Sequence, residues 1–277
     1  MKRSVGERVG HRLRGTLRVV WSGVLAAWVA VVMIAAGALA AELSASEILD
    51  RMTGTAVLSG SGQAELELVT ENARGQQRAN RLRIFRMEAS SGATQQLLEY
   101  LDPPDVRGTK FLSIDEPDKP AQMWLYLPAL GRERRIAGSA TQDQFMGTDF
   151  TYDEIGGGTT YKEDYTAQRL ADTAVDGRAA YVLKLTPKST DKKYSYVQMW
   201  VWKETFLPLR IDFFDRSGRL EKQLLTADFR QDEQGKWLPY RITMVNAKSK
   251  SKTLVQLISQ RSGAVPEEYF TLRYLRR

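Results

Sequence analysis

The chain has 277 residues, a formal net charge of +7, one histidine and no cysteine. The lack of cysteine excludes disulfides, a thiolate nucleophile and a lipidated cysteine anchor. The one histidine is His11, so the chain beyond it cannot form a Ser-His-Asp triad or a zinc site that uses imidazole. Carboxylate chemistry, Ser-Lys chemistry or no catalysis remain, and of these we expect no catalysis, with no metal and no cofactor.

Most of the positive charge lies at the N-terminus. The first 18 residues contain six cations and one acid, so they carry five of the seven net charges, and we expect no nucleic-acid partner. An uncharged stretch from Val19 to Ala41 follows and includes Ala38-Leu39-Ala40. A basic start, an apolar run and an A-x-A site are typical of a secretory signal peptide. We predict a signal peptide over residues 1–40 and a periplasmic location for the rest of the chain.

The apolar stretch also allows a second interpretation. Its 23 residues, at a helical rise of about 1.5 Å each, are long enough to cross a bilayer core of roughly 30 Å. The alternative is therefore an uncleaved N-terminal anchor in the inner membrane, with the remaining chain facing the periplasm.

Beyond the apolar stretch, one short helix is followed by a long series of strands. Ser44 and Glu47 have the spacing of a capping box, which predicts a helix through EILDRM. From there the apolar residues follow period two, and Asp176-Gly177, Ser217-Gly218 and Gln234-Gly235 predict hairpin turns. The predicted strands are residues 64–70, 80–88, 94–101, 110–115, 122–128, 165–175, 179–187, 194–203, 209–215, 220–230, 238–247 and 252–259.

These strands predict a mainly β fold: a single antiparallel sheet of about 11–12 strands that curls over its own apolar face. Residues 129–164 interrupt the series with repeated glycines and scattered apolar residues. A long stretch without periodicity inside a regular sheet is more often functional than accidental. We predict one domain, residues 41–277, with a lid or loop inserted at about 129–164.

Two strands have large apolar side chains on both faces. Trp124 and Tyr126 share one face of residues 122–128, and Trp200 and Trp202 share one face of residues 194–203. Such strands either fill a core, which is the simpler interpretation, or present one face to an apolar cavity. The candidate cavity residues, including three from the inserted loop, are Trp124, Tyr126, Phe145, Met146, Phe150, Trp200 and Trp202.

Three arginines follow the first of these strands directly. Arg132, Arg134 and Arg135 offer bidentate hydrogen bonds to a phosphate or carboxylate headgroup, or to a partner protein. The alternative is a solvated loop whose charge is partly offset by Glu133.

Carboxylates leave one enzymatic alternative. Asp149, Asp153 and Glu154 are close enough in sequence to supply an acid and a base, although their spacing does not fit a calcium loop. Isolated acids in polar segments are usually solvated or cap helices, and we interpret them in this way. The S-x-x-K match at residues 189–192 lies in a polar stretch without the companion motifs, which indicates a solvated turn.

Two stretches resemble a known family. Residues 123–155, MWLYLPALGRERRIAGSATQDQFMGTDFTYDEI, and the closing FTLRYL of residues 270–275 resemble the outer-membrane lipoprotein-sorting protein family of the LolA/LolB-like superfamily. The resemblance implies an antiparallel half-barrel with short helices over its concave face, enclosing a hydrophobic cavity. Members of the superfamily carry lipoprotein acyl chains to the outer membrane, bind other lipids or sense envelope stress.

The resemblance and the candidate residues together predict a periplasmic, non-enzymatic carrier or chaperone. Its expected ligands are lipoprotein acyl chains or phospholipid-like lipids. Its expected partners are an inner-membrane exporter of the resistance-nodulation-division type and an outer-membrane acceptor. The alternatives are an envelope-stress sensor or an accessory subunit of a membrane transport complex.

Overall fold

The computed structural model describes residues 42–52, 58, 60–117, 119–157, 161–190 and 192–277. The chain divides into two units, Met1–Leu43 and Ser44–Arg277, and the second contains the whole sheet and its core. The predicted signal peptide or anchor, residues 1–40, lies outside the described residues. Within the described ranges, no helix combines the length and hydrophobicity that a membrane span requires.

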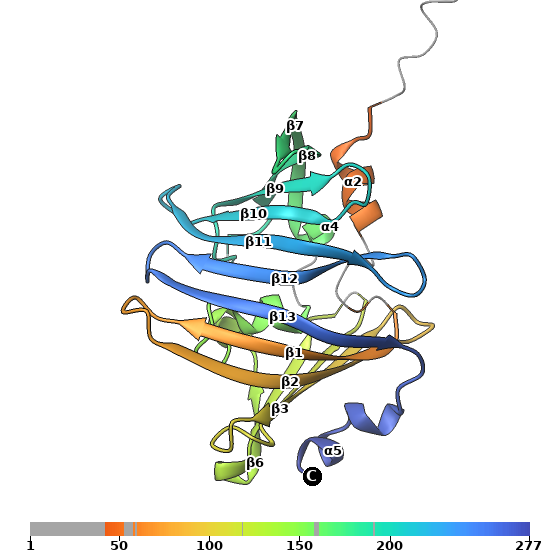
Figure 1. The fold of residues 1–277 in the computed structure, drawn as a ribbon, viewed down its shortest axis with the longest axis vertical. Helices are drawn as coiled ribbons and strands as arrows, with labels where there is room; N and C mark the ends of the chain where they lie inside the picture. Colours follow the sequence, from red (N-terminus) through yellow and green to blue (C-terminus); the bar gives the residue numbers. More distant parts are fainter. Residues whose placement is uncertain (1–41, 53–57, 59, 118, 158–160, 191) are drawn as a thin grey trace, which may run out of the picture. The chain divides into compact units, whose positions relative to one another are not determined.

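The unit Ser44–Arg277 is built on one antiparallel sheet of thirteen strands (Figure 1). The strand order is β6-β5-β4-β3-β2-β1-β13-β12-β11-β10-β9-β8-β7, so β6 and β7 form the two edges and the sheet stays open. The strands are β1 (Gly62–Glu71), β2 (Gln77–Glu88), β3 (Thr94–Asp102), β4 (Lys110–Asp115), β5 (Gln122–Leu127), β6 (Arg132–Ile136), β7 (Tyr165–Val175), β8 (Arg178–Pro187), β9 (Tyr196–Trp202), β10 (Pro208–Phe214), β11 (Leu220–Gln231), β12 (Trp237–Asn246) and β13 (Ser251–Ser262).

The predicted sheet is confirmed, with one strand more than expected. All twelve predicted strands are present, and the thirteenth, β6, lies inside the segment that we predicted as a loop. Its sequence RERRI has no apolar alternation because it is an edge strand with mostly exposed side chains. Edge strands often carry charged side chains, which prevent pairing with another sheet. The sequence of β6 is therefore charged at most positions and does not alternate between apolar and polar residues.

Short helices complete the unit. They are α2 (Ala45–Met52), η1 (Pro128–Leu130), η2 (Gly138–Gln142), α3 (Tyr152–Gly156), α4 (Tyr161–Asp164), η3 (Glu267–Phe270) and α5 (Leu272–Leu275). The predicted capping box of α2 is present: Glu47 N donates to Ser44 Oγ at 3.2 Å, and Ser44 N donates to Glu47 Oε2 at 2.8 Å. The turn at Asp176-Gly177 has φ of 48° and 78°, as a two-residue hairpin requires.

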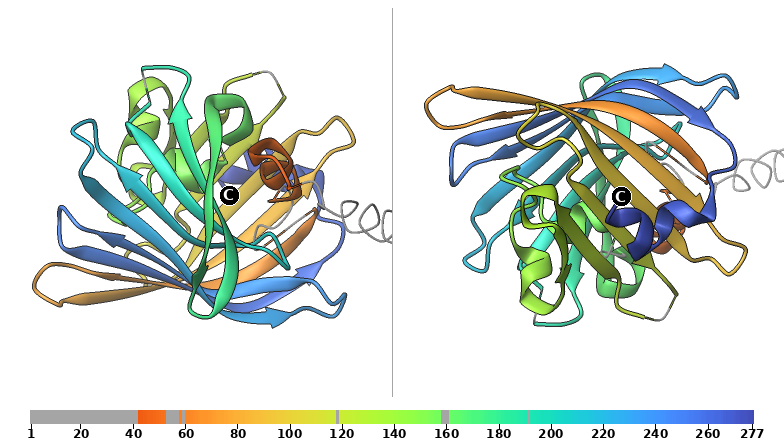
Figure 2. Two further views of the ribbon diagram at one scale, coloured as in Figure 1. Left: turned by 90° about the horizontal axis from the view of Figure 1, so that it is seen from above. Right: turned by 90° about the horizontal axis from the view of Figure 1, so that it is seen from below.

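The curled sheet has a concave face and an outer face, and each carries its own hydrophobic cluster. Figure 2 shows α2, α3 and α4 inside the curve of the sheet and α5 outside it. On the concave face, Leu98, Phe111 and Met123 pack with side chains of the segment after β6. On the outer face, Leu97 and Leu112 pack with residues of η3 and α5. The strands β3 to β5 are therefore covered on both sides, which explains their apolar side chains on both faces.

Candidate functional site

The segment between β6 and α4 crosses the concave face, and we call residues 138–157 the inner segment (Figure 2). Its side chains Phe145 and Tyr152 contact Phe111 of β4, with ring centroids 5.2 and 5.7 Å from that of Phe111. Phe145 and Phe111 are fully buried. The inner segment therefore fills the space in which a ligand on this part of the concave face would lie.

A tight turn gives the inner segment its shape. Phe145 N donates to Phe150 O at 2.8 Å, which closes the loop F-M-G-T-D-F. Inside the loop, Met146 and Gly147 have φ of 48° and 77°, in the left-handed region that glycine adopts without strain. Thr151 then begins α3 with a capping box to Glu154. The loop and the helix cap explain why this stretch of sequence has no strand or long-helix periodicity.

Asp149 joins the inner segment to β13. It is buried, and its two carboxylate oxygens accept hydrogen bonds from Thr253 Oγ1 at 2.8 Å and Ser251 Oγ at 2.5 Å. Its backbone N donates to Thr253 Oγ1 at 2.9 Å. A buried carboxylate is tolerated only with such partners, so Asp149 acts here as an anchor and not as a solvated acid.

Lys222 of β11 joins the inner segment to the other half of the sheet. Its side chain is 2% exposed, and Nζ donates to Glu154 Oε2 at 2.5 Å and to Asp149 O at 3.1 Å. Tyr194 donates through its hydroxyl to the other oxygen of Glu154 at 3.2 Å. Burial lowers the pKa of Lys222, although the neighbouring Glu154 carboxylate acts in the opposite direction. Burial likewise raises the pKa of Tyr194.

The C-terminal end of α3 is hydrogen-bonded to strands β3 and β4, in the other half of the sheet. Gln96 of β3 donates to Ile155 O at 2.9 Å, and Ser113 of β4 donates to Gly156 O at 2.6 Å. A Cβ at Gly156 would lie 2.6 Å from Met123 Cε, so a larger residue here would require the Met123 side chain to move. The inner segment thus bridges β3 and β4 with β11 and β13 through a small set of polar contacts.

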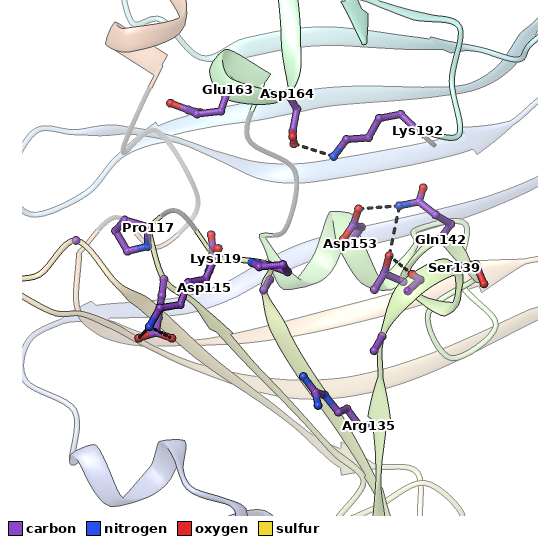
Figure 3. A pocket seen from close by; sticks show the side chains of 17 residues that line it. Asp115, Pro117, Lys119, Arg135, Ser139, Gln142, Asp153, Glu163, Asp164 and Lys192 are labelled. Atoms are coloured by element: carbon purple, nitrogen blue, oxygen red, sulfur yellow. Dashed lines mark hydrogen bonds and ion pairs between the residues drawn. The ribbon is translucent and has the colours of Figure 1, made fainter. Parts of the chain in front are cut away.

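A polar pocket of about 950 Å³ lies beside the inner segment (Figure 3). Its wall contains the ion pair of Lys192 with Asp164 at 2.9 Å and the hydrogen bond from Gln142 to Asp153 at 2.7 Å. Burial raises the pKa of Asp153 and of Asp115. This pocket differs from the apolar cavity that we predicted, because its lining includes five carboxylates, two lysines, Arg135 and Gln142.

The structure separates the predicted cavity residues into two groups on opposite faces of the sheet. Phe145 and Met146 belong to the concave cluster, and Phe150 is buried in the same loop. Trp124 and Tyr126 pack on the outer face with η3 and α5. These side chains therefore do not line one cavity together.

Trp200 and Trp202 also lie on the outer face. On β10, Phe213 is opposite Lys222, so Phe213 lies on the concave face. Arg210 is three positions before Phe213 on the same strand, so it points to the other face, and Trp200, which is opposite Arg210, points there too. Trp202 packs with Ala180 and Leu209 in a separate outer cluster. Period two correctly predicts which residues share a face, but it carries no information on which face is concave.

The three predicted arginines lie on or beside the edge strand β6. Arg135 lines the polar pocket, and Arg132 and Arg134 are exposed. Glu133, between them, accepts two hydrogen bonds from Arg276 of the C-terminal segment, and this guanidinium lowers the pKa of Glu133 to about 2. The arginines therefore do not form one headgroup site in this arrangement.

The partners of the inner segment on β11 and β13 were not predicted from the sequence. Lys222 stands at an inward position of its strand, on the same face as Leu224, and this lone cation on an apolar face was a usable signal. Ser251 and Thr253 gave no comparable signal. In the described part of the chain, no group of three or more acidic side chains is arranged to hold a metal ion.

Comparisons with known proteins agree with this fold. A family model whose description reads "Uncharacterized protein" matches residues 92–277. No curated protein is a significant match to the chain. Among solved structures, a domain from Vibrio parahaemolyticus assigned as an outer membrane lipoprotein-sorting protein is 27% identical, with a TM-score of 0.77 over 84% of this chain and 98% of that one.

Two further structures share the architecture. A DUF1329 family protein from Desulfovibrio piger is 26% identical, with a TM-score of 0.76 over 83% of this chain and 97% of that one. A LolA superfamily protein from Nitrosomonas europaea has a TM-score of 0.67 over 84% of this chain and 99% of that one, at 22% identity, and shows the fold alone. The predicted resemblance to the LolA-like half-barrel is confirmed.

Proposed function

The chain belongs to the family whose model spans residues 92–277, and from this premise and the LolA-like fold we propose that it is a periplasmic carrier. In this proposal it binds acyl chains of lipoproteins or lipids on the concave face and carries them towards the outer membrane. The signal peptide predicted over residues 1–40 supports export. The similarity to a lipoprotein-sorting domain from Vibrio parahaemolyticus supports the class of ligand.

The observation that carries the proposal is the inner segment itself. It places Phe145, Phe150 and Tyr152 on the concave face, where they are buried, but it is held to the sheet by side-chain hydrogen bonds and not by strand pairing. A segment of this kind can leave without breaking the sheet. We infer that the inner segment moves away from the sheet on binding and that the acyl chain takes the place of these aromatic side chains.

Approximate magnitudes support such an exchange. A C16 chain gains roughly 12 kcal/mol on leaving water, at about 0.8 kcal/mol for each methylene. Re-exposing three buried aromatic side chains costs about 5 to 9 kcal/mol, at about 1.5 to 3 kcal/mol each. Each hydrogen bond that breaks costs about 0.5 to 1.5 kcal/mol more, or about 1.5 to 3 kcal/mol where one partner is charged. The gain from burying the acyl chain is therefore larger than the cost of re-exposing these three aromatic side chains.

Arg86 offers a partner for the polar end of an anionic ligand. It lies on the concave face of β2, opposite Gln96, and its Nε is buried without a hydrogen-bond partner among the described residues. Burial lowers its pKa, while the nearby carboxylates of Glu88 and Asp115 act against this shift. A ligand carboxylate or phosphate would supply the missing acceptor.

Native mass spectrometry of residues 44–277 with monomeric palmitate tests the proposal. We expect one bound acyl chain on the wild type. Phe145→Ala should raise the occupancy, because it removes the ring contacts that hold the inner segment to Phe111 and Tyr152. Trp200→Ala is the matched control on the outer face and should leave the occupancy unchanged.

Two results would contradict the carrier. One is a folded wild type and a folded Phe145→Ala variant that both take up no palmitate. The other is a loss of binding in Trp200→Ala but not in concave-face variants, which would move the ligand to the outer face.

The proposal extends to the two ends of the route. The donor implied by the family resemblance is an inner-membrane exporter of the resistance-nodulation-division type, and the acceptor is an outer-membrane component. Cross-linking in intact cells from the exposed edge strand β6 is the direct test, since this edge borders the inner segment.

A further inference from the structure

An aromatic surface covers the outer face of β9 to β12. Trp202 lies 5.4 Å from Phe229 and 5.8 Å from Trp237, measured between ring centroids, and Tyr196 stacks on Phe214 at 4.2 Å. Trp237 is 36% exposed. We call this surface the outer aromatic face; its members are Tyr196, Trp200, Trp202, Phe214, Phe229 and Trp237.

Cations lie directly over these rings. Lys184 Nζ is 4.6 Å from the ring centroid of Tyr196, and the guanidinium carbons of Arg210 and Arg178 are 4.6 and 4.9 Å from the rings of Trp200 and Trp202. Arg210 also pairs with Asp212, whereas Arg178 and Lys184 form no ion pair with any described carboxylate. Exposed Arg241 of β12 adds a further cation on this side. The outer aromatic face is therefore both apolar and positively charged.

Among the described residues, the rest of the outer face has neither an excess of positive charge nor uncovered aromatic side chains. Over β1 and β2 the charges are balanced, because Arg81 and Arg83 both pair with Glu65 and Glu67 adds a second carboxylate on the same face. Over β3 to β5 the aromatic side chains are covered by η3 and α5. Figure 1 looks onto the outer face of β9 to β13, and no helix of the described residues lies in front of it. The chain thus covers one outer aromatic cluster and leaves the other open.

We propose that the outer aromatic face docks the protein on the anionic phospholipid headgroups of a membrane surface. Tryptophan and tyrosine place an apolar ring and a polar edge at the level of lipid headgroups, and arginine and lysine are attracted to anionic lipids. The surface cations without carboxylate partners supply the charge complementarity. This docking goes beyond the carriage of a ligand on the concave face, because the two surfaces lie on opposite sides of the sheet.

Sedimentation with vesicles tests the docking. Residues 44–277 hold the whole sheet and both hydrophobic clusters, so this unit is used without the apolar N-terminal stretch. The vesicles contain phosphatidylglycerol and phosphatidylcholine in equal parts, with pure phosphatidylcholine as the neutral comparison. We expect binding to the anionic vesicles, weak binding to the neutral ones, and release at an ionic strength of about 1 M, where the screening length is about 3 Å.

A charge-matched pair of triple variants locates the effect. Arg178→Gln/Lys184→Gln/Arg241→Gln should weaken vesicle binding by about 100-fold, at about fivefold for each cation. Arg74→Gln/Arg107→Gln/Arg277→Gln makes the same change in net charge at exposed positions elsewhere, and we expect a much smaller loss. Circular dichroism confirms that each variant is folded.

Three results would overturn the proposal. They are equal binding to anionic and neutral vesicles, equal losses in the two triple variants, and no vesicle binding by the wild type. A stable acidic protein partner that requires Arg178, Lys184 and Arg241, together with absent vesicle binding, would assign the face to protein recognition instead. Palmitate uptake without vesicles is measured separately, so failure of docking and failure of carriage are distinguishable.

Discussion

Lys222 of β11 contacts two residues of the inner segment and so helps to hold this segment on the concave face. It is a buried cation on an otherwise apolar face, and it contacts Glu154 and the backbone of Asp149. Taking both charges out of water costs free energy, so the pair adds little net stability compared with apolar side chains of the same size. The pair instead makes each of its two charges depend on the other. When one partner is removed, the remaining charge stays buried without an opposite charge beside it.

A double-mutant cycle measures how strongly Lys222 and Glu154 depend on each other. Lys222→Met should lower the free energy of unfolding by about 3 to 5 kcal/mol, because it leaves the Glu154 carboxylate buried without an opposite charge. Glu154→Gln keeps the helix cap but leaves the ammonium unpaired, and the double variant should recover much of the loss. Urea denaturation measures all four proteins.

Lys252→Met is the matched control for this cycle. Lys252 pairs with Glu71 at 2.9 Å, but its side chain is 49% exposed, so its loss should cost less than about 1 kcal/mol. Purely additive effects of Lys222→Met and Glu154→Gln would show that the pair does not act as a unit.

Residue pairs that share a face were predictable from the sequence, but the identity of that face was not. Trp124 and Tyr126 do lie on one side of β5, as the alternation requires. Whether that side is concave depends on how the sheet curls and on the position of the C-terminal segment. The alternation along a single strand contains neither piece of information. For this reason Trp124, Tyr126 and Trp200 were predicted to line the cavity, although they lie on the outer face.

Whole elements were predicted more accurately than the site. The twelve predicted strands depended on local alternation and on glycine turns, which one sequence records directly. The edge strand β6 escaped because its pairing with β5 needs no apolar residue on the solvent side. The contacts of the inner segment escaped because Asp149 and Ser251 are 102 positions apart and meet only in the folded sheet.

The contact between β6 and α5 has a defined pH dependence. Arg276 lowers the pKa of Glu133 from 4.5 to about 2. A carboxylate with a lowered pKa stabilises the docked segment fully above about pH 4.5, and this contribution is lost as the pH falls from 4.5 towards 2. We therefore expect α5 to stay docked at mildly acidic pH.

A titration of Glu133 by NMR measures this contact. The carboxyl resonance should have a midpoint near pH 2 in the wild type and a value close to the ordinary one in Arg276→Ala. Arg277→Ala is the neighbouring control and should leave the midpoint low. A wild-type midpoint near 4.5 would mean that Glu133 and Arg276 are not paired in solution.

At the scale of the whole molecule, the two faces of the sheet have separate roles in this account. The concave face carries the ligand once the inner segment leaves, and the outer aromatic face holds the protein at a membrane surface. The open edges β6 and β7 are joined by the inner segment and α4, so movement of the inner segment does not require any strand to separate. A rigid sheet with one mobile cover is a simple way to combine stability with reversible binding.

The most direct measurement locks the inner segment in place and asks whether the ligand still binds. The chain has no cysteine, so Asp149→Cys/Ser251→Cys introduces a single possible disulfide, between two side chains now in contact at 2.5 Å. Palmitate binding to residues 44–277 is then followed before and after addition of a reductant, with wild type treated in the same way. The reduced variant lacks the hydrogen bonds of Asp149, so we expect it to bind at least as tightly as the wild type, and we expect the oxidised variant to bind at least about tenfold more weakly than the reduced one. Equal binding by both forms would show that the ligand does not displace the inner segment.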